Sequence, residues 1–221
     1  RQVMAFSLTA CGGGDAGSNS SSGSKTSDAG SSDKTITVGF SQVGAESDWR
    51  TANTESMKST FSEDNGYELI FDDAQQKQEN QLTAIRNFIQ QEVDYIVLAP
   101  VTETGWDTVL QEAKDAGIPV IAYDRLIKSD AVSYYISFDN YTVGTLQGQY
   151  VIDTLDLDNA GDKTYNIEFT AGDPADNNAG YFFNGAYDTL KPYLDAGTLN
   201  VVSGQTDFDS VATAAWDTQT A

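Results

Sequence analysis

The chain has 221 residues, of which 39% are hydrophobic and 11% aromatic, enough for one large or two small domains with apolar cores. Its formal net charge of −21 repels phosphate groups and argues against nucleic acid as a partner. The sequence has no histidine, no Asp-rich calcium loop and no run of about 20 apolar residues that would span a bilayer. We therefore expect no metal, no cofactor and no transmembrane helix.

The first 34 residues predict a lipid anchor and a tether. A short apolar stretch leads into Leu8-Thr9-Ala10-Cys11-Gly12, which resembles a lipobox. Residues 1–11 are then a partial lipoprotein signal peptide, cleaved before the only cysteine, whose thiol carries the lipid. Residues 12–34 are almost entirely small and polar and cannot bury enough apolar surface to fold, which predicts a disordered Ser/Gly tether. This composition argues against the alternative, a free buried cysteine.

From Thr35 onward, short β-rich runs alternate with amphipathic runs, which is typical of βα units with a parallel sheet. The helical stripes between the runs contain Leu82 to Ile89 and Trp106 to Ala113. We expect an N-terminal lobe over residues 35–127. Its predicted strands are Ile36–Ser41, Tyr67–Asp72, Tyr95–Ala99 and Pro119–Tyr123.

The pattern then restarts, which predicts a second lobe over residues 128–221. Its expected strands are Tyr134–Phe138, Asn166–Thr170 and Leu199–Ser203. Its expected helices are one that carries Val143, Leu146, Tyr150 and Val151, one over about residues 178–194, and one from about Ser210. No helix stop signal follows Ser210, so we expect this last helix to continue past Ala221 and the second lobe to be incomplete.

Several polar residues are predicted to meet at the carboxyl edge of the sheet, where ligands bind in open α/β folds. Asp124 and Arg125 follow a predicted strand, and we expect them to pair with each other. A carboxylate and a guanidinium suit a polyhydroxyl ligand, although a surface ion pair is an alternative. Trp49 and Arg50 follow the first strand, where an indole ring can pack on a sugar ring and a guanidinium can donate a fork of hydrogen bonds. The alternative for Trp49 is a place in the core.

Three further residues complete this group. Glu46 is a candidate acceptor in the loop before Trp49, or else a helix cap. Asn177 and Asn178 follow a later strand, and their amides both donate and accept; one of them can instead cap the next helix. Asp139 and Asn140 are interpreted as a helix N-cap and left out of the site.

Segments over nearly all of residues 35–221 resemble bacterial sugar-binding proteins. The first three segments resemble galactofuranose-binding periplasmic proteins, and the rest resemble multiple-sugar and xylose-binding proteins; both groups belong to the ribose-binding-like class that serves ABC transporters. The segments are Gly39-Phe40-Ser41-Gln42-Val43-Gly44 with Ser47-Asp48-Trp49-Arg50, Gln75 to Gln81, Ala99-Pro100-Val101, Tyr123-Asp124-Arg125-Leu126-Ile127, Ser137-Phe138-Asp139-Asn140, Gly172 to Ala179 and Ala215-Trp216-Asp217.

The resemblance implies a type I periplasmic binding protein, an α/β fold of two Rossmann-like lobes that closes on a monosaccharide of the galactofuranose, galactose, glucose or xylose type. It adds Trp216 to the site as a second aromatic wall, with a core tryptophan as the alternative. It also implies a monomeric, extracytoplasmic lipoprotein that delivers its ligand to an ABC transporter permease, rather than an enzyme.

Three other functions remain open at this point. A receptor for a sensor kinase or chemoreceptor has the same sequence features. A glycosidase needs two carboxylates, but an Asp124 paired with Arg125 is a poor general acid. A sugar-responsive repressor needs an N-terminal helix-turn-helix, where this chain has the lipobox and the tether.

Overall fold

The structure is a computed structural model that describes residues 34–221. The expected lipobox with Cys11, and all of the expected tether except Lys34, lie outside the described residues. Of the helices that the structure describes, none is both long and apolar enough to cross a membrane.

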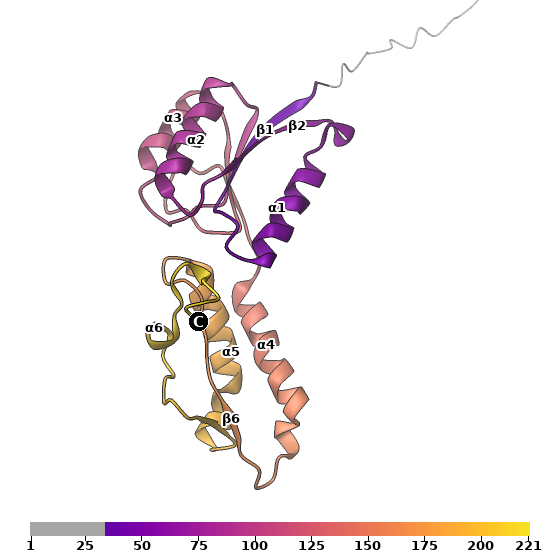
Figure 1. The fold of residues 1–221 in the computed structure, drawn as a ribbon, viewed down its shortest axis with the longest axis vertical. Helices are drawn as coiled ribbons and strands as arrows, with labels where there is room; N and C mark the ends of the chain where they lie inside the picture. Colours follow the sequence, from indigo (N-terminus) through magenta and orange to yellow (C-terminus); the bar gives the residue numbers. More distant parts are fainter. Residues whose placement is uncertain (1–33) are drawn as a thin grey trace, which may run out of the picture. The chain divides into compact units, whose positions relative to one another are not determined.

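A parallel five-stranded sheet organises the first half of the described chain (Figure 1). Its strands are β1 (Ile36–Gln42), β2 (Tyr67–Asp73), β3 (Tyr95–Leu98), β4 (Val120–Tyr123) and β5 (Tyr134–Ile136), in the order β2-β1-β3-β4-β5. The helices between them are α1 (Asp48–Thr60), α2 (Gln78–Gln90) and α3 (Asp107–Asp115), with a 3-10 turn η1 (Glu63–Asn65) before β2. The expected α/β class with a parallel sheet is confirmed. We call residues 34–136 the five-stranded region.

This sheet has an apolar core on each face. Side chains alternate along a strand, so Ile96 and Leu98 pack with α2 and α3, while Val97 packs with α1 on the other face. A glycine is required at position 39, because an added Cβ would lie 2.5 Å from the Phe88 ring of α2. Burial on both faces explains why β3 and β4 are continuous apolar runs in the sequence.

The predicted strand at Tyr134–Phe138 is shorter than expected and lies in a different sheet. As β5 it covers only Tyr134–Ile136 and pairs in parallel with β4. The boundary expected after Ile127 therefore does not coincide with the sheet boundary, which follows Ile136. Periodicity identifies a strand but not its partner, and the short connection from β4 to β5 places this strand on the first sheet.

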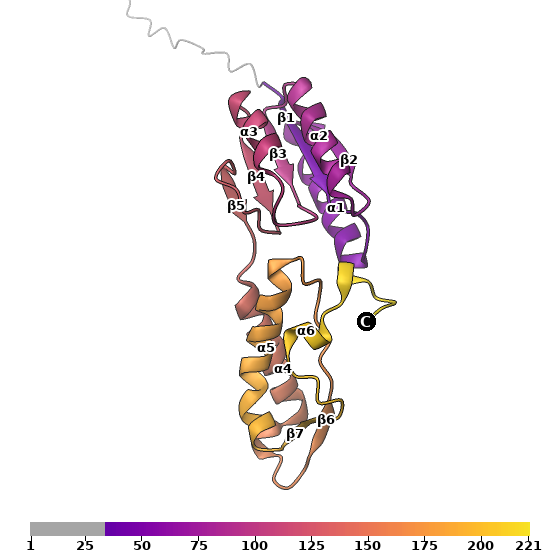
Figure 2. The ribbon, with the colours of Figure 1, turned by 90° about the vertical axis from the view of Figure 1, so that its left-hand side faces the viewer.

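We call residues 137–221 the two-stranded region. It contains α4 (Asn140–Leu155), the 3-10 turn η2 (Leu157–Asn159), β6 (Tyr165–Ile167), α5 (Asn177–Asp195) and β7 (Leu199–Val201), and β6 pairs in parallel with β7. Helices α4 and α5 lie side by side in Figure 1 and in Figure 2. Glycines permit this contact: an added Cβ on Gly144 would lie 2.2 Å from the Phe182 carbonyl oxygen, and one on Gly185 would lie 2.1 Å from that of Tyr141.

The helix expected from Ser210 to Ala221 is wrong. Helix α6 covers only Phe208–Val211, because Ala212 is extended and forms an isolated parallel bridge with Ala171. The chain then enters the 3-10 turn η3 (Ala214–Trp216), in which Ala215 and Trp216 have positive φ angles of 56° and 54°. The chain at Ala212 pairs with the segment after β6 and therefore does not continue as a helix.

Candidate ligand-binding site

A cavity of about 540 Å³ lies at the carboxyl edge of the five-stranded sheet, beside the first turns of α1, α4 and α5. Seven of the eight ligand-contact residues expected from the sequence line it, and Asn177 does not. The lining residues are Glu46, Ser47, Trp49, Arg50, Asp124, Arg125, Phe138, Asn140, Val143, Gln147, Asp176, Asn178, Phe182 and Trp216.

Four of these residues lie in the first turn of α1 or just before it. Ser47 caps the helix, and its Oγ accepts a hydrogen bond from the backbone N–H of Arg50 at 3.1 Å, so Glu46 is not the cap. Glu46 Oε1 instead accepts from Nε of Arg50 at 2.9 Å. Trp49 is 52% exposed, which excludes a place in the core, and the Arg50 guanidinium lies 4.9 Å from its ring centroid.

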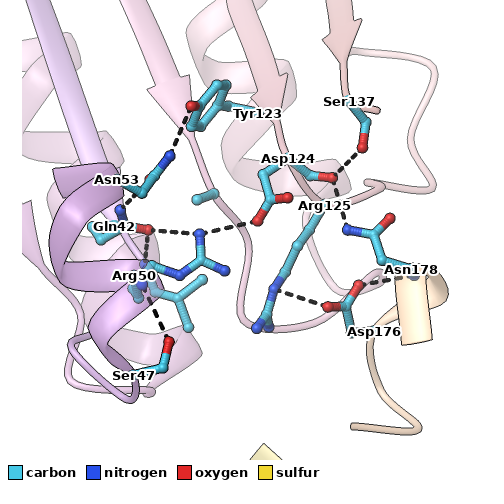
Figure 3. Close-up of polar contacts among 12 residues, drawn as sticks. Gln42, Ser47, Arg50, Asn53, Tyr123, Asp124, Arg125, Ser137, Asp176 and Asn178 are labelled. Atoms are coloured by element: carbon cyan, nitrogen blue, oxygen red, sulfur yellow. Dashed lines mark hydrogen bonds and ion pairs between the residues drawn. The ribbon is translucent and has the colours of Figure 1, made fainter. Parts of the chain in front are cut away.

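Arg50 is the partner of Asp124. Its Nη1 lies 3.0 Å from Asp124 Oδ2 and 3.3 Å from Gln42 Oε1, and Figure 3 shows the Asp124 carboxylate directed at this guanidinium. The expected pair between Asp124 and Arg125 is wrong. The backbone of Asp124 is left-handed, with φ of 66°, and the neighbouring side chains have different partners.

Arg125 contacts two other carboxylates. Its Nη2 lies 3.8 Å from Glu46 Oε1, and its Nε lies 3.3 Å from Oδ2 of Asp176 (Figure 3). Both arginines are nearly fully buried. Three carboxylates and two guanidiniums therefore form one chain of alternating charge along the cavity wall, which offsets much of the cost of burying each charge.

Asp176 is a site residue that the sequence interpretation missed. It caps α5 by accepting from the backbone N–H of Asn178 at 3.0 Å, and its Oδ2 also accepts from Nε1 of Trp216 at 3.1 Å. Burial raises the pKa of the Asp176 carboxyl, and the Arg125 charge opposes this shift. Its place directly before the two asparagines was a usable signal, because an acid is a common N-cap after a strand.

Of the two adjacent asparagines, the cavity wall contains Asn178 and not Asn177. Successive residues of a helix point about 100° apart, so two neighbours do not share one face. Asn178 is 3% exposed, and its Oδ1 accepts from Nδ2 of Asn140 at 2.7 Å. Asn140, interpreted from the sequence as part of a cap, is a second missed residue: Asp139 is the N-cap of α4, which leaves the Asn140 amide available.

Trp216 is partly buried and lies on the 3-10 turn η3. Its ring covers Gly172, where an added Cβ would lie 2.2 Å from the indole, and it makes an edge contact with Phe182 at a centroid distance of 6.3 Å. The tertiary contacts, rather than an amphipathic helix, bring this residue to the wall. Trp49 and Trp216 provide aromatic surface beside the charged groups.

Within residues 34–221, two buried side-chain atoms lack a hydrogen-bond partner, and both belong to this wall: Oε2 of Glu46 and Nε of Arg125. The Arg125 Nε–H is close to Asp176 but does not point at its oxygen in hydrogen-bond geometry. One atom is an acceptor and the other a donor. Each atom therefore keeps hydrogen-bonding capacity that the described residues do not use.

The comparisons with known proteins agree with this architecture. A family model described as "Periplasmic binding protein domain" matches residues 38–221. The multiple sugar-binding periplasmic protein SbpA of Azospirillum brasilense is 46% identical over 71% of this chain and 44% of its own length. The galactofuranose-binding protein YtfQ of Escherichia coli is 50% identical over 53% of this chain and 37% of its own.

A solved ABC transporter solute binding protein from Clostridium phytofermentans, with bound beta-D-glucose, has a TM-score of 0.76 and 43% identity over 83% of this chain and 56% of its own. The chain thus spans less than half the length of the two curated relatives. The resemblance inferred from the sequence motifs is confirmed. Because the family model covers nearly all of the described residues, the chain belongs to the periplasmic binding protein domain family.

Proposed function

We propose that this chain binds a monosaccharide without chemically changing it. The observation that carries the proposal is the cavity wall itself: alternating buried carboxylates and guanidiniums, with an unpartnered acceptor on Glu46 and an unpartnered donor on Arg125, beside Trp49 and Trp216. A neutral polyol with apolar ring faces matches both parts of this wall, because hydroxyls satisfy charged donors and acceptors and C–H groups pack on indoles.

The relatives narrow the ligand class. Their names and titles refer to multiple sugars, galactofuranose and glucose. We propose a pentose or hexose in either the furanose or the pyranose form. The proposed contacts from the sequence that line the cavity are Glu46, Trp49, Arg50, Asp124, Arg125, Asn178 and Trp216, and Asp176 and Asn140 join them from the geometry.

We also propose an extracytoplasmic location and delivery of the sugar to an ABC transporter permease. The relatives are named as periplasmic or as ABC transporter components. Cys11 would anchor the protein through a lipid, with residues 12–34 as the tether. The mass of the mature N-terminal peptide tests the anchor: an unlipidated Cys11 in membrane fractions would contradict it. Sugar-dependent stimulation of a reconstituted permease ATPase would separate transport from a receptor that serves a sensor kinase or chemoreceptor.

Binding is tested by calorimetric titration of the full chain with D-glucose, D-galactose, D-xylose and L-arabinose. We expect one of these sugars to bind, and Asp124→Asn and Arg50→Ala each to weaken it by about 10- to 100-fold, since each removes a charge-assisted interaction. The matched controls are Asp64→Asn and Arg86→Ala, which change the same residue types outside the cavity. Circular dichroism confirms that each variant is folded.

Two results would contradict this function. A folded protein that binds none of the sugars would remove the sugar assignment. Recovery of a chemically altered sugar after long incubation, by NMR of the filtrate, would favour the enzyme alternative. We expect the sugar to be recovered intact, because the carboxylates Glu46 and Asp124 are both engaged by Arg50.

A further inference from the structure

Four residues at the junction of the two regions form a closed ring of hydrogen bonds. The Ser137 hydroxyl donates to the main-chain carbonyl of Asp124 at 2.7 Å, and Asn178 Nδ2 donates to the same carbonyl at 3.0 Å (Figure 3). Asn140 Nδ2 donates to Ser137 Oγ at 3.3 Å and to Asn178 Oδ1 at 2.7 Å. The ring therefore connects the end of β4, the segment after β5, and the starts of α4 and α5.

The ring has two arms, and in each arm the hydrogen bonds run from the Asn140 amide, which donates twice, to the Asp124 carbonyl, which accepts twice. The two donor hydrogens of the Asn140 amide have two acceptors, and the Ser137 hydroxyl accepts one bond and donates the other. The Asp124 carbonyl uses both of its lone pairs. Such a directional chain polarises its members, and the bonds to Asn178 are buried, which makes a broken ring costly.

The carbonyl at the centre of the ring belongs to a residue in a strained conformation. Asp124 has a φ of 66°, and its N–H donates to the Ile136 carbonyl at 2.8 Å. A left-handed non-glycine residue persists when its surroundings hold it. In this conformation the Asp124 carboxylate reaches Nη1 of Arg50 on the cavity wall.

We propose that Ser137 is a positioning residue: through the ring it holds the left-handed backbone of Asp124 and thereby directs the carboxylate at Arg50. Ser137 does not line the cavity, so it acts on the ligand site only through the two lining residues that it bonds, the Asp124 carbonyl and the Asn140 amide. The expected influence of Ser137 on sugar affinity rests on the proposed function. Its expected influence on the Asp124 backbone does not rest on that function.

The test compares Ser137→Ala, Ser137→Thr and Ser59→Ala in the full chain. Ser59 is the matched control, because its hydroxyl also donates to a main-chain carbonyl, that of Ser56 at 2.9 Å, on the exposed face of α1. We expect Ser137→Ala to lower the hydrogen-exchange protection of the Asp124 amide by about 3- to 10-fold, as the loss of one net hydrogen bond predicts. Ser137→Thr keeps the hydroxyl and restores protection, and Ser59→Ala leaves it unchanged.

The second measurement is the affinity for the sugar that binds the wild-type protein. We expect Ser137→Ala to weaken it by about 3- to 10-fold and Ser137→Thr to restore it. In an Asn178→Ala background the ring is already open, so Ser137→Ala should have less effect on protection than in the wild type.

The two proposals can fail separately. Unchanged hydrogen-exchange protection of the Asp124 amide in Ser137→Ala would show that the ring does not hold the Asp124 backbone. An equal loss of protection in Ser137→Thr would show the same. Lowered protection with unchanged sugar affinity shows that the ring does not direct the carboxylate, and also overturns the proposal. If none of the four sugars binds the wild-type protein, the proposed function fails, while the exchange data still decide whether Ser137 holds the Asp124 backbone.

Discussion

Both regions consist of α-helices and parallel β-strands, but these elements pack in different ways. In the five-stranded region, side chains of alternating strand residues fill a core on each face of the sheet. In the two-stranded region, one cluster that includes Ile152, Leu190 and Leu199 is supplemented by direct backbone contact between α4 and α5 at Gly144 and Gly185.

Large exposed apolar side chains occur in both regions of the described chain. Five of them lie in the five-stranded region, three on its edge strand β5, and six lie in the two-stranded region. Leu146 and Tyr150 of α4 are 62% and 71% exposed. Apart from β5, the five-stranded region buries most of its large apolar side chains, whereas helix α4 of the two-stranded region exposes several. We therefore expect the stability of the five-stranded region to depend on the volume of its buried side chains. The stability of the two-stranded region should depend on the lack of side chains at the glycines between α4 and α5.

The largest effect is expected for Phe88→Ala in the five-stranded region. Phe88 is 2% exposed and lies against Gly39, so its removal leaves a cavity between α2 and the sheet. We expect a loss of about 3 to 5 kcal/mol in the free energy of unfolding, measured by urea denaturation. The control is Phe138→Ala in the two-stranded region, where the ring is 68% exposed and we expect less than about 0.5 kcal/mol. Equal losses in the free energy of unfolding for the two variants would contradict the proposed difference in core packing between the regions.

The next effect is expected for Gly185→Ala in α5. The new methyl group would lie 2.1 Å from the Tyr141 carbonyl oxygen, a main-chain atom that moves only with α4. We expect a loss of about 3 kcal/mol from overpacking. Gly180→Ala in the same helix is the matched control: no atom lies within 4 Å of its added Cβ, and we expect a gain of about 0.5 to 1 kcal/mol from helix propensity. A stabilising Gly185→Ala would show that the helices are not in backbone contact.

The smallest effects are opposite pH dependences in the two regions. Burial raises the pKa of Asp176, so its contribution to stability is fully present below the ordinary value of 3.8 and is lost as the pH rises through the higher folded-state pKa. Hydrogen bonds from Lys34 and the Thr37 backbone lower the pKa of Asp94, so its contribution is present above 3.8 and is lost as the pH falls.

The measurement is the stability difference between the wild type and each Asp→Asn variant from about pH 3 to pH 7. As the pH rises, we expect the wild type to lose stability relative to Asp176→Asn and to gain stability relative to Asp94→Asn. If both stability differences changed with pH in the same direction, this would contradict the difference in environment between the buried cavity wall and the partly exposed residue before β3.

Much of the fold was predictable because burial leaves a pattern in the sequence. The first four strands lie within one or two residues of their predicted bounds, since each is a short β-rich run between amphipathic runs. Helix α5 was likewise expected within a residue at each end. Two errors arise from tertiary pairing: β5 joins the first sheet, and the segment after α6 pairs at Ala171 instead of continuing as a helix.

For the site too, the sequence predicts the positions of residues better than their tertiary partners. Sequence position at strand and helix ends identified Trp49, Arg50, Asp124 and Arg125 as members of one edge. It did not identify which charges meet, because adjacent residues were assumed to pair. Asp176 was missed because its role depends on Arg125 and Trp216, which are distant in the sequence.

The sequence by itself determined the α/β class, the positions of most elements and the edge at which the polar residues gather, since these follow from hydrophobic periodicity and from the direction of parallel strands. Only the tertiary structure decided that Asp124 pairs with Arg50, that Asp176 joins Arg125 to Trp216, and that Ser137 and Asn178 share one carbonyl. These contacts join residues separated by 13 to 74 positions. Their geometry depends on a backbone torsion and on helix packing that no local pattern encodes.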